Sequence, residues 1–259
     1  MSWILAVETS TEWCSVALGR RRPDAGEGGP ACLVRHEHTG PRSSSRILPA
    51  VGEVLAEAGI ALADCAAIAF GAGPGSFTGL RTACGVAQGL AFGADLPVVP
   101  VNSLMACAER VRLGEPRHPA LPAGMPVLVA LDARMDEAYA GAFRYDAAAR
   151  AWQALTPMQV CGPDRVVLPD SPFWLAGNAA TVFGERLAAA GAAAHAVPEA
   201  MPHAAAVVSL ALDALARGDT VDAADAMPLY LRDKVAQTIA ERQAAAESRA
   251  TLASAGERP

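Results

Sequence analysis

Lysine is nearly absent from this sequence, and aromatic side chains are scarce. Lys234 is the only lysine among 259 residues. Mechanisms that need a lysine amine, such as Schiff-base formation or Walker-type phosphate binding, therefore have one candidate, near the C-terminus. Aromatic residues make up 5% of the chain. Because alanine supplies most of the apolar content, we expect an interior of closely packed small side chains and many helices.

Clustered positive charge is also lacking. The net charge of −6 and the isoelectric point of about 5.4 argue against a protein that holds nucleic acid through its own phosphate contacts, although they leave room for a local basic patch. Hydrophobic residues form 52% of the chain and charged residues 19%, which excludes a disordered chain and a coiled-coil rod. The length suits one large globular domain or two of ordinary size.

Targeting and membrane-spanning patterns are missing as well. The chain reaches Glu8 after the short apolar run 3–7 with no basic region before it, so we expect no signal peptide. Apolar stretches such as 82–94 are interrupted before the roughly 18 residues that a membrane span needs. The cysteines are scattered without a Cys-x-x-Cys pair. Reduced, buried thiols in a cytoplasmic protein are the simplest interpretation.

The spacing of apolar residues predicts an α/β chain whose second half repeats the first in outline. In the first half we predict strands at residues 3–7, 14–18, 32–38, 65–70 and 98–101, and helices at 43–58, 78–92 and 103–112. The serines at 43–45 offer N-cap hydroxyls for the first helix, which either starts near Pro49 or is kinked there. In the second half we predict strands at 127–131, 137–145 and 173–176, and helices at 179–190 and 204–216.

The domain boundaries follow from this outline and from one irregular stretch. Residues 114–126 carry several prolines and glycines and read as a loop close to the boundary. We expect an N-terminal domain over residues 1–101 and a C-terminal domain over 102–232. Residues 233–259 have no wide apolar face and are expected to form a helical or disordered tail.

Two segments could face a phosphate group. The first is a glycine-rich turn that follows a predicted strand and opens a helix, an arrangement that favours anions. The second is the corner 8–12, whose carboxylates and hydroxyls could hold Mg²⁺ near a nucleotide. The alternatives are glycines that permit close packing and a solvated hairpin turn. The residues that could face nucleotide or phosphate are Glu8, Thr9, Ser10, Gly73, Pro74, Gly75 and Ser76.

The same two segments carry a family resemblance. Residues 4–10, Ile-Leu-Ala-Val-Glu-Thr-Ser, and residues 71–81, Gly-Ala-Gly-Pro-Gly-Ser-Phe-Thr-Gly-Leu-Arg, resemble the TsaB family of bacterial tRNA threonylcarbamoyladenosine biosynthesis proteins. Residues 87–91, 96–101 and 228–236 agree with the family too, so the resemblance covers about 3–236. The residues that match the family signature are Phe77, Thr78, Gly79, Leu80, Arg81, Tyr230, Leu231 and Arg232.

The resemblance implies a fold and a role. The implied fold has two related actin/Hsp70/sugar-kinase-like α/β domains with mixed sheets flanked by helices. The implied role is that of a non-catalytic subunit in a heterodimer with the related catalytic subunit TsaD. With the ATPase TsaE and ATP, that pair transfers a threonylcarbamoyl group to the adenosine beside the tRNA anticodon. It also implies that ATP or ADP, if bound, lies at the complex interface, that contact with tRNA is indirect and that no cofactor is held for catalysis.

The resemblance also allows a test for a catalytic metal. The related TsaD family carries a His-x-x-x-His pair on the helix after the strand that matches residues 98–101. In this chain the matching positions are Ser103 and Cys107, a poor ligand pair for iron or zinc. His36 and His38 share a strand face but lack an evident third ligand. We therefore expect no catalytic metal and no catalytic residue in this chain.

Small residues recur along one side of the predicted helix 78–92. They are spaced at three or four residues, while the opposite side is apolar enough to face a sheet. Glycines inside a helix cost on the order of 1 kcal/mol each relative to alanine, so close approach of another helix would compensate. In the resembled family this helix and the one before it meet TsaD. Two alternatives therefore remain for what packs against these small residues: a partner, including a second copy of the chain, or the chain's own first helix. The expected interface residues are Leu55, Thr82, Gly85, Val86, Gly89 and Gly93.

Two further functions compete with that of a binding subunit. An autonomous ATP-dependent kinase or ATPase would use Glu8, Thr9 and the turn at 73–76. A peptidase is the weaker alternative, because the sequence holds neither a Gly-x-Ser-x-Gly elbow nor a His-Glu-x-x-His motif. Turnover by the isolated protein distinguishes these two functions from the first.

Overall fold

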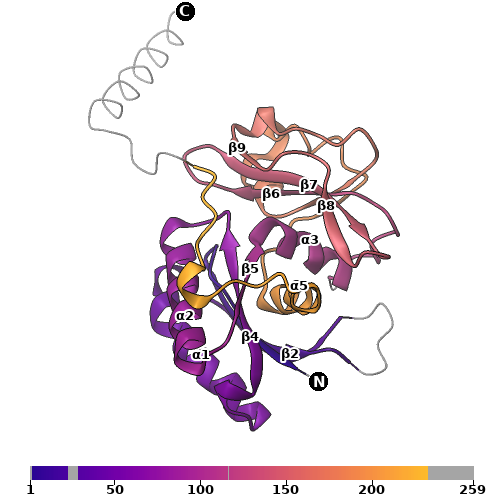
Figure 1. Cartoon of the computed structure of the whole chain (residues 1–259). Helices are drawn as coiled ribbons and strands as arrows, with labels where there is room; N and C mark the ends of the chain where they lie inside the picture. Colours follow the sequence, from indigo (N-terminus) through magenta and orange to yellow (C-terminus); the bar gives the residue numbers. More distant parts are fainter. Residues whose placement is uncertain (1, 23–28, 116, 233–259) are drawn as a thin grey trace, which may run out of the picture.

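The computed structural model describes residues 2–22, 29–115 and 117–232, which form two β-sheets with helices around and between them (Figure 1). The first sheet has the strand order β3-β2-β1-β4-β5. Its strands are β1 (Trp3–Glu8), β2 (Trp13–Arg20), β3 (Ala31–His38), β4 (Cys65–Gly73) and β5 (Val98–Asn102). β1, β2 and β3 are antiparallel neighbours, whereas β4 and β5 run parallel to β1.

The second sheet repeats this pattern, with the order β11-β10-β6-β7-β8. Its strands are β6 (Val127–Asp132), β7 (Ala138–Asp146), β8 (Ala151–Ala154), β10 (Trp174–Ala176) and β11 (His195–Val197). Again the first three strands are antiparallel neighbours, and the last two run parallel to the first of them. The short strand β9 (Gln159–Cys161) is an addition that pairs with β7. The two related halves expected from the sequence are present.

Local signals in the sequence set the ends of the helices. The helices are α1 (Ser43–Ala58), α2 (Phe77–Ala94), α3 (Ser103–Leu113), α4 (Ala179–Phe183) and α5 (Ala204–Arg217). The Ser76 hydroxyl accepts from the amide of Gly79 at the start of α2, and the Asn102 side chain caps α3 in the same way. α1 and α5 end at Gly59 and Gly218, which adopt the left-handed conformation that glycine tolerates.

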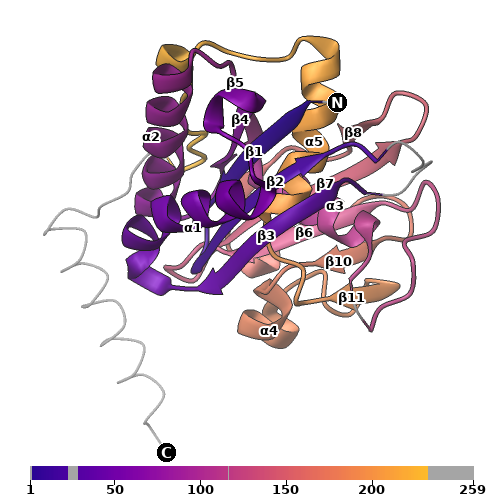
Figure 2. The ribbon, with the colours of Figure 1, turned by 90° about the horizontal axis from the view of Figure 1, so that it is seen from below.

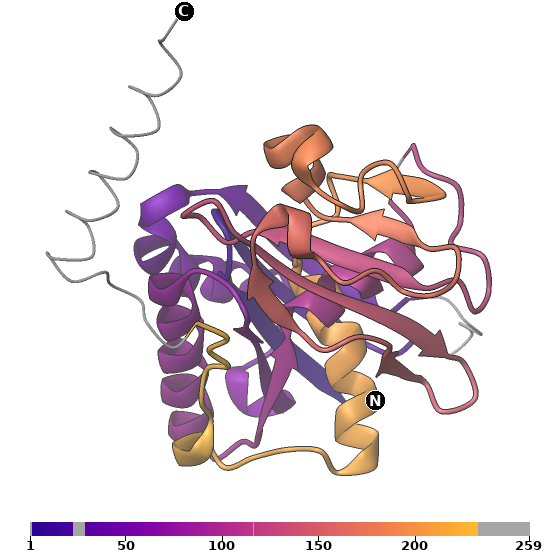
Figure 3. The ribbon, with the colours of Figure 1, turned by 90° about the horizontal axis from the view of Figure 1, so that it is seen from above.

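Alternation along β1 assigns its side chains to two cores. Leu5 and Val7 pack with α1 and α2 on the outer face of the first sheet, and Ile4 and Ala6 pack with α5 on the inner face. Figure 2 shows α1 and α2 as neighbours on the same flank of this sheet. α3 packs on the inner face of the second sheet and also contacts α5, so both helices lie between the sheets (Figures 1 and 3).

Three local predictions are wrong. The predicted helix 179–190 ends at Phe183, because Gly184 adopts a φ of +54° and a short 3-10 turn follows. The serines at 43–45 form the first turn of α1 instead of capping it, and Pro49 lies inside that helix. The glycine-rich turn begins while β4 is still paired, since Gly71 and Gly73 both match residues of β5. The strands β8, β9 and β11 were not predicted.

The last described segment returns to the first half of the molecule. α5 packs against β1, β2 and β4, and Val221 pairs with Val98 at the edge of the first sheet. Residues 204–229 therefore pack against the first sheet, although they follow the second sheet in sequence. The division of the chain between residues 101 and 102 stays a prediction. The predicted tail at 233–259 lies outside the described residues.

Candidate functional site

Glu8, at the end of β1, is a deeply buried carboxylate among the predicted site residues. Its side chain is 1% exposed. The amide of Ser10 donates to Oε1 at 2.5 Å, and the hydroxyl of Ser103 donates to Oε2 at 3.3 Å. Burial raises the pKa of the Glu8 carboxyl, and the hydrogen bonds from Ser10 and Ser103 oppose that rise. A Cβ atom at Gly71 would overlap this carboxylate, so the glycine makes room for it.

The corner after Glu8 packs directly into the glycine-rich turn. Thr9 Oγ1 donates to the carbonyl of Gly79 at 2.7 Å, and the amide of Ser76 donates to the carbonyl of Ser10 at 2.7 Å. A Cβ atom at Gly79 would overlap the Thr9 carbonyl oxygen, and one at Gly75 would lie 2.5 Å from that of Ser10. These glycines permit two backbone segments to approach within hydrogen-bonding distance. The Ser10 hydroxyl is buried without a hydrogen-bond partner among the described residues.

The packing of the corner also bears on phosphate binding. The Ser76 amide and hydroxyl are already engaged within the chain, by the carbonyl of Ser10 and the amide of Gly79. Pro74, which follows Gly73 through a cis peptide bond, is buried. A Cβ atom at Gly73 would lie 2.6 Å from the Leu229 carbonyl oxygen. The close-packing interpretation of the turn has direct support here, whereas the phosphate site stays a prediction.

The signature residues at 77–81 and at 230–232 are in contact. The Arg81 guanidinium lies 3.9 Å from the centre of the Phe77 ring and donates from Nε to the Tyr230 hydroxyl at 3.0 Å. Arg232 then reaches the turn between β6 and β7, where it binds the Ala133 carbonyl and the Glu137 carboxylate. Leu231 packs at the edge of the core between α3 and the second sheet. Residues 226–232 thus form a strap that joins α2 to the second sheet.

The predicted interface helix has two different sides. Leu80, Ala83, Ala87 and Ala91 are buried toward the sheet, and Leu55 and Val86 are partly buried beside them. On the other side Gly85, Gly89 and Gly93 are exposed, and in the described part of the chain nothing lies within 4 Å of a Cβ atom built on any of them. Thr82 is half-buried and donates to the Thr78 carbonyl. The alternative in which these glycines pack only against the first helix is therefore wrong.

One residue of this surface was missed by the sequence reasoning. Phe92 is 82% exposed, and together with Gly85, Gln88 and Gly89 it lines a shallow groove whose other wall is Ala223 and Ala224. Phe92 follows Gly89 by three residues and Gly85 by seven, so helical spacing alone places it on the glycine side. Leu48 on α1 is exposed as well, at 53%. We call Leu48, Gly85, Gly89, Phe92 and Gly93 the α1–α2 face.

The positions tested for a metal are engaged in other contacts. Ser103 donates to Glu8, and the fully buried Cys107 thiol donates to the Ala200 carbonyl at 2.9 Å. Burial raises the pKa of that thiol well above its ordinary value. Among the described residues, no group of three or more histidine, cysteine or acidic side chains is arranged to hold a metal ion. His36 instead stacks on Trp13, with ring centres 4.4 Å apart.

Two repeated mixed sheets with helices around and between them define an actin/sugar-kinase-like α/β protein. The family described as "TsaD: tRNA N6-adenosine threonylcarbamoyltransferase" matches residues 37–240. The tRNA threonylcarbamoyladenosine biosynthesis proteins TsaB of Haemophilus influenzae and Escherichia coli are each 35% identical to this chain, over 90% of it and over 94% and 96% of their own lengths. The chain belongs to the TsaB family.

A solved structure agrees with this assignment. YeaZ from Pseudomonas aeruginosa superposes with a TM-score of 0.76 at 38% identity, and the match covers 89% of this chain and all of that one. In the part of this chain that the structure describes, no helix has both the length and the apolar composition needed to cross a membrane. The cysteines in that part are all free thiols.

Proposed function

We propose that this chain is a non-catalytic subunit that binds and supports a TsaD-like catalytic subunit. The pair, with a TsaE-like ATPase, ATP and tRNA, would transfer a threonylcarbamoyl group to the adenosine beside the tRNA anticodon. Membership of the TsaB family supports this proposal. The positions of Ser103 and Cys107 support it too, because neither residue offers an imidazole to a metal and the Cys107 thiol is engaged within the chain. The net charge of −6 is a further support, since an acidic chain would leave most contacts with tRNA phosphates to its partners.

The α1–α2 face is the observation that carries the proposal. Three glycines within one helix cost helix stability, yet no described residue lies within 4 Å of a Cβ atom built on any of them. The face also exposes two large apolar side chains, Phe92 and Leu48. Small residues let a helix of another chain approach closely, and an exposed aromatic ring next to them supplies apolar area to bury. A TsaD-like subunit is the proposed occupant, and a second copy of this chain takes its place when that subunit is absent.

The remaining parts of the proposal concern nucleotide and location. The chain holds no cofactor for catalysis, and ATP or ADP binds at the interface of the complex. The close packing of Thr9 and Ser10 against the glycine turn supports this over an autonomous kinase or ATPase, because the turn's groups already serve the fold. The protein acts in the cytoplasm, which fits its free cysteines.

Co-purification with a TsaD-like subunit tests the proposal. Gly85→Arg places a long charged side chain on the α1–α2 face without touching the fold, since the space around Gly85 is open. We expect it to lower affinity for the subunit at least about tenfold, as measured by size-exclusion chromatography with mass detection and by titration. Gly191→Arg is the matched control, because Gly191 is also exposed with open space around it and lies in the second half.

Two results would contradict the proposal. One is a folded Gly85→Arg variant that binds the TsaD-like subunit as tightly as the Gly191→Arg control. The other is ATP hydrolysis by the isolated chain at a rate that does not increase when the TsaD-like subunit, the TsaE-like ATPase and tRNA are added, which would favour the autonomous ATPase.

A further inference from the structure

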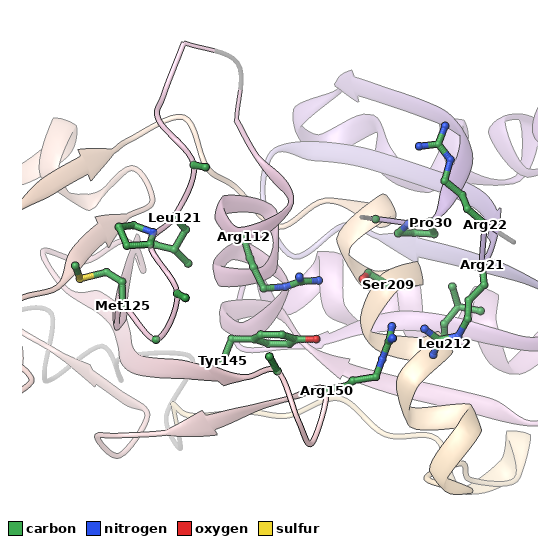
Figure 4. A pocket seen from close by; sticks show the side chains of 16 residues that line it. Arg21, Arg22, Pro30, Arg112, Leu121, Met125, Tyr145, Arg150, Ser209 and Leu212 are labelled. Carbon is green, nitrogen blue, oxygen red and sulfur yellow. The ribbon is translucent and has the colours of Figure 1, made fainter. Parts of the chain in front are cut away.

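A cavity of about 380 Å³ opens where the two halves meet, away from α1 and α2. α3, α5, the β7–β8 turn, the end of β2 and the loop 120–125 contribute to it (Figure 4). This volume lies within the range of small-molecule sites in proteins. The proposed subunit role assigns nothing to it, and its residues are separate from the α1–α2 face.

Four arginines from three different segments line this cavity. Arg21 follows β2, Arg112 belongs to α3 and Arg150 lies in the β7–β8 turn, with Arg22 beside them. Figure 4 shows the side chains of Arg21, Arg112 and Arg150 on one side of the cavity and those of Leu121 and Met125 on the other. In a chain with a net charge of −6, this gathering of guanidinium groups stands apart from the surrounding surface.

Two buried carboxylates hold the arginines in place. Asp213 of α5 accepts from Arg21 at 2.5 Å and from Arg150 at 2.9 Å. Glu109, which is 1% exposed, accepts from Nε and Nη2 of Arg112 and also binds Ser209 and Trp152. These contacts fix the positions of the guanidinium groups before any ligand arrives.

The carboxylates do not use all the donors. Four arginines line the cavity, whereas the two acids bind three of them through a few N–H groups. Arg112 donates from Nε and Nη2 and Arg150 from Nε, so Nη1 of Arg112 and both Nη atoms of Arg150 make no hydrogen bond among the described residues. Guanidinium forks with free N–H groups and uncompensated positive charge suit the several oxygens of a phosphate group.

The opposite wall is apolar. Leu121, Pro122 and Met125 of the loop line it, whereas Leu212 of α5 lies on the side of Arg21 (Figure 4). The Tyr145 ring, on which the Arg112 guanidinium stacks at 4.2 Å, forms the floor between the apolar and the charged parts. We propose that this cavity binds a small organic phosphate, with its phosphate group on Arg112 and Arg150 and its uncharged part against Leu121 and Met125.

Adenosine monophosphate, adenosine and inorganic phosphate are suitable probes for calorimetric titration of the full chain. We expect adenosine monophosphate to bind with one site per chain, and each of its two halves alone to bind at least about tenfold more weakly. Arg150→Gln should weaken binding of adenosine monophosphate at least about tenfold, and Arg150→Lys should recover part of that loss. Arg217→Gln, the same change of charge on α5 outside the cavity, is the matched control.

Each outcome decides the proposal. Unchanged affinity in Arg150→Gln, or no saturable binding in the millimolar range, overturns it. Equal affinity for inorganic phosphate and adenosine monophosphate overturns the organic part, because the apolar wall would then contribute nothing. If thermal unfolding shows Arg150→Gln to be misfolded, Arg112→Lys replaces it, since it keeps a cation beside Glu109 but removes the guanidinium fork assigned to the phosphate, and unchanged affinity there overturns the proposal. Co-purification with a TsaD-like subunit should be unaffected by Arg150→Gln, so failure here is distinguishable from failure of the proposed function.

Discussion

The two halves of the molecule share a strand order but differ in the helices on their outer faces. In the first half α1 and α2 have 16 and 18 residues and cover the sheet side by side. In the second half the segment that corresponds to α2 is α4, with five residues, and the strand β9 and a short turn stand where α1 would be. The strand order is the same in both halves because each strand must pair with its neighbours. The outer helices are under no such constraint, so those of the first half can form a surface that binds a partner.

The strand ends show the same contrast at the level of single residues. β1 ends at Glu8 and β6 at Asp132, and each carboxylate accepts a hydrogen bond from the amide two residues further on. Glu8 is buried beneath the glycine turn, whereas Asp132 is partly exposed. Each half also places a glycine against a backbone carbonyl, Gly79 against that of Thr9 in the first half and Gly177 against that of Ala130 in the second.

The largest predicted effect tests whether both halves depend on these glycines. A Cβ atom at Gly79 would overlap the Thr9 carbonyl oxygen, and one at Gly177 that of Ala130. Because both obstacles are backbone atoms, we expect Gly79→Ala and Gly177→Ala each to lower the free energy of unfolding by about 3 kcal/mol or more. Urea unfolding measures this, with Gly191→Ala as the control in open space. If only one of the two variants were destabilised, the two glycines would not have the same role in the two halves.

The second prediction concerns Glu8, which is buried, whereas the matching strand end in the second half carries the partly exposed Asp132. Burial raises the folded-state pKa of Glu8 above its ordinary value of 4.5. The folded chain then keeps a proton that the unfolded chain releases, so Glu8's contribution to stability falls as the pH rises above about 4.5. We expect the free energy of unfolding of wild type minus that of Glu8→Gln to fall as the pH rises over this range, with a slope of at most about 1.4 kcal/mol per pH unit.

Glu12, on the same corner, supplies a control of opposite sign. A hydrogen bond from His38 lowers the pKa of its carboxyl, so its contribution is lost as the pH falls. Urea unfolding at several pH values should therefore give difference curves with opposite slopes for Glu8→Gln and Glu12→Gln. A flat curve for Glu8→Gln would mean that the carboxyl titrates alike in the folded and unfolded chain.

The smallest predicted effect sharpens the contrast between the outer helices. Gly85→Ala on α2 meets no obstacle, so it should raise the free energy of unfolding by up to about 1 kcal/mol. Gly184→Ala, where the second half ends its helix at a φ of +54°, should lower that free energy by about 1 kcal/mol. Thermal or urea unfolding checks both signs. A destabilised Gly85→Ala variant would show that the α1–α2 face is constrained within the chain.

Prediction from the sequence succeeded where a short segment determines the outcome. Short apolar runs located β1, β2 and β6, and small residues at helical spacing located the exposed side of α2. Prediction failed where a single backbone conformation decides, as at Gly184, which ends α4 after an alanine-rich stretch that favours helix. Pro49 inside α1 is the converse case, since packing of Ile47 and Val51 on the sheet maintains a helix through it.

The sequence by itself determined the duplicated α/β order, the family and the shortage of lysine that removes amine chemistry. Only the tertiary structure decided that the glycine turn is filled by Thr9 and Ser10, because that contact joins residues about seventy positions apart. The arginine cavity has the same origin, since Arg21, Arg112, Arg150 and Asp213 lie far apart in the sequence. Periodicity shows which way a side chain points within its own element, but folding alone decides which other elements it meets.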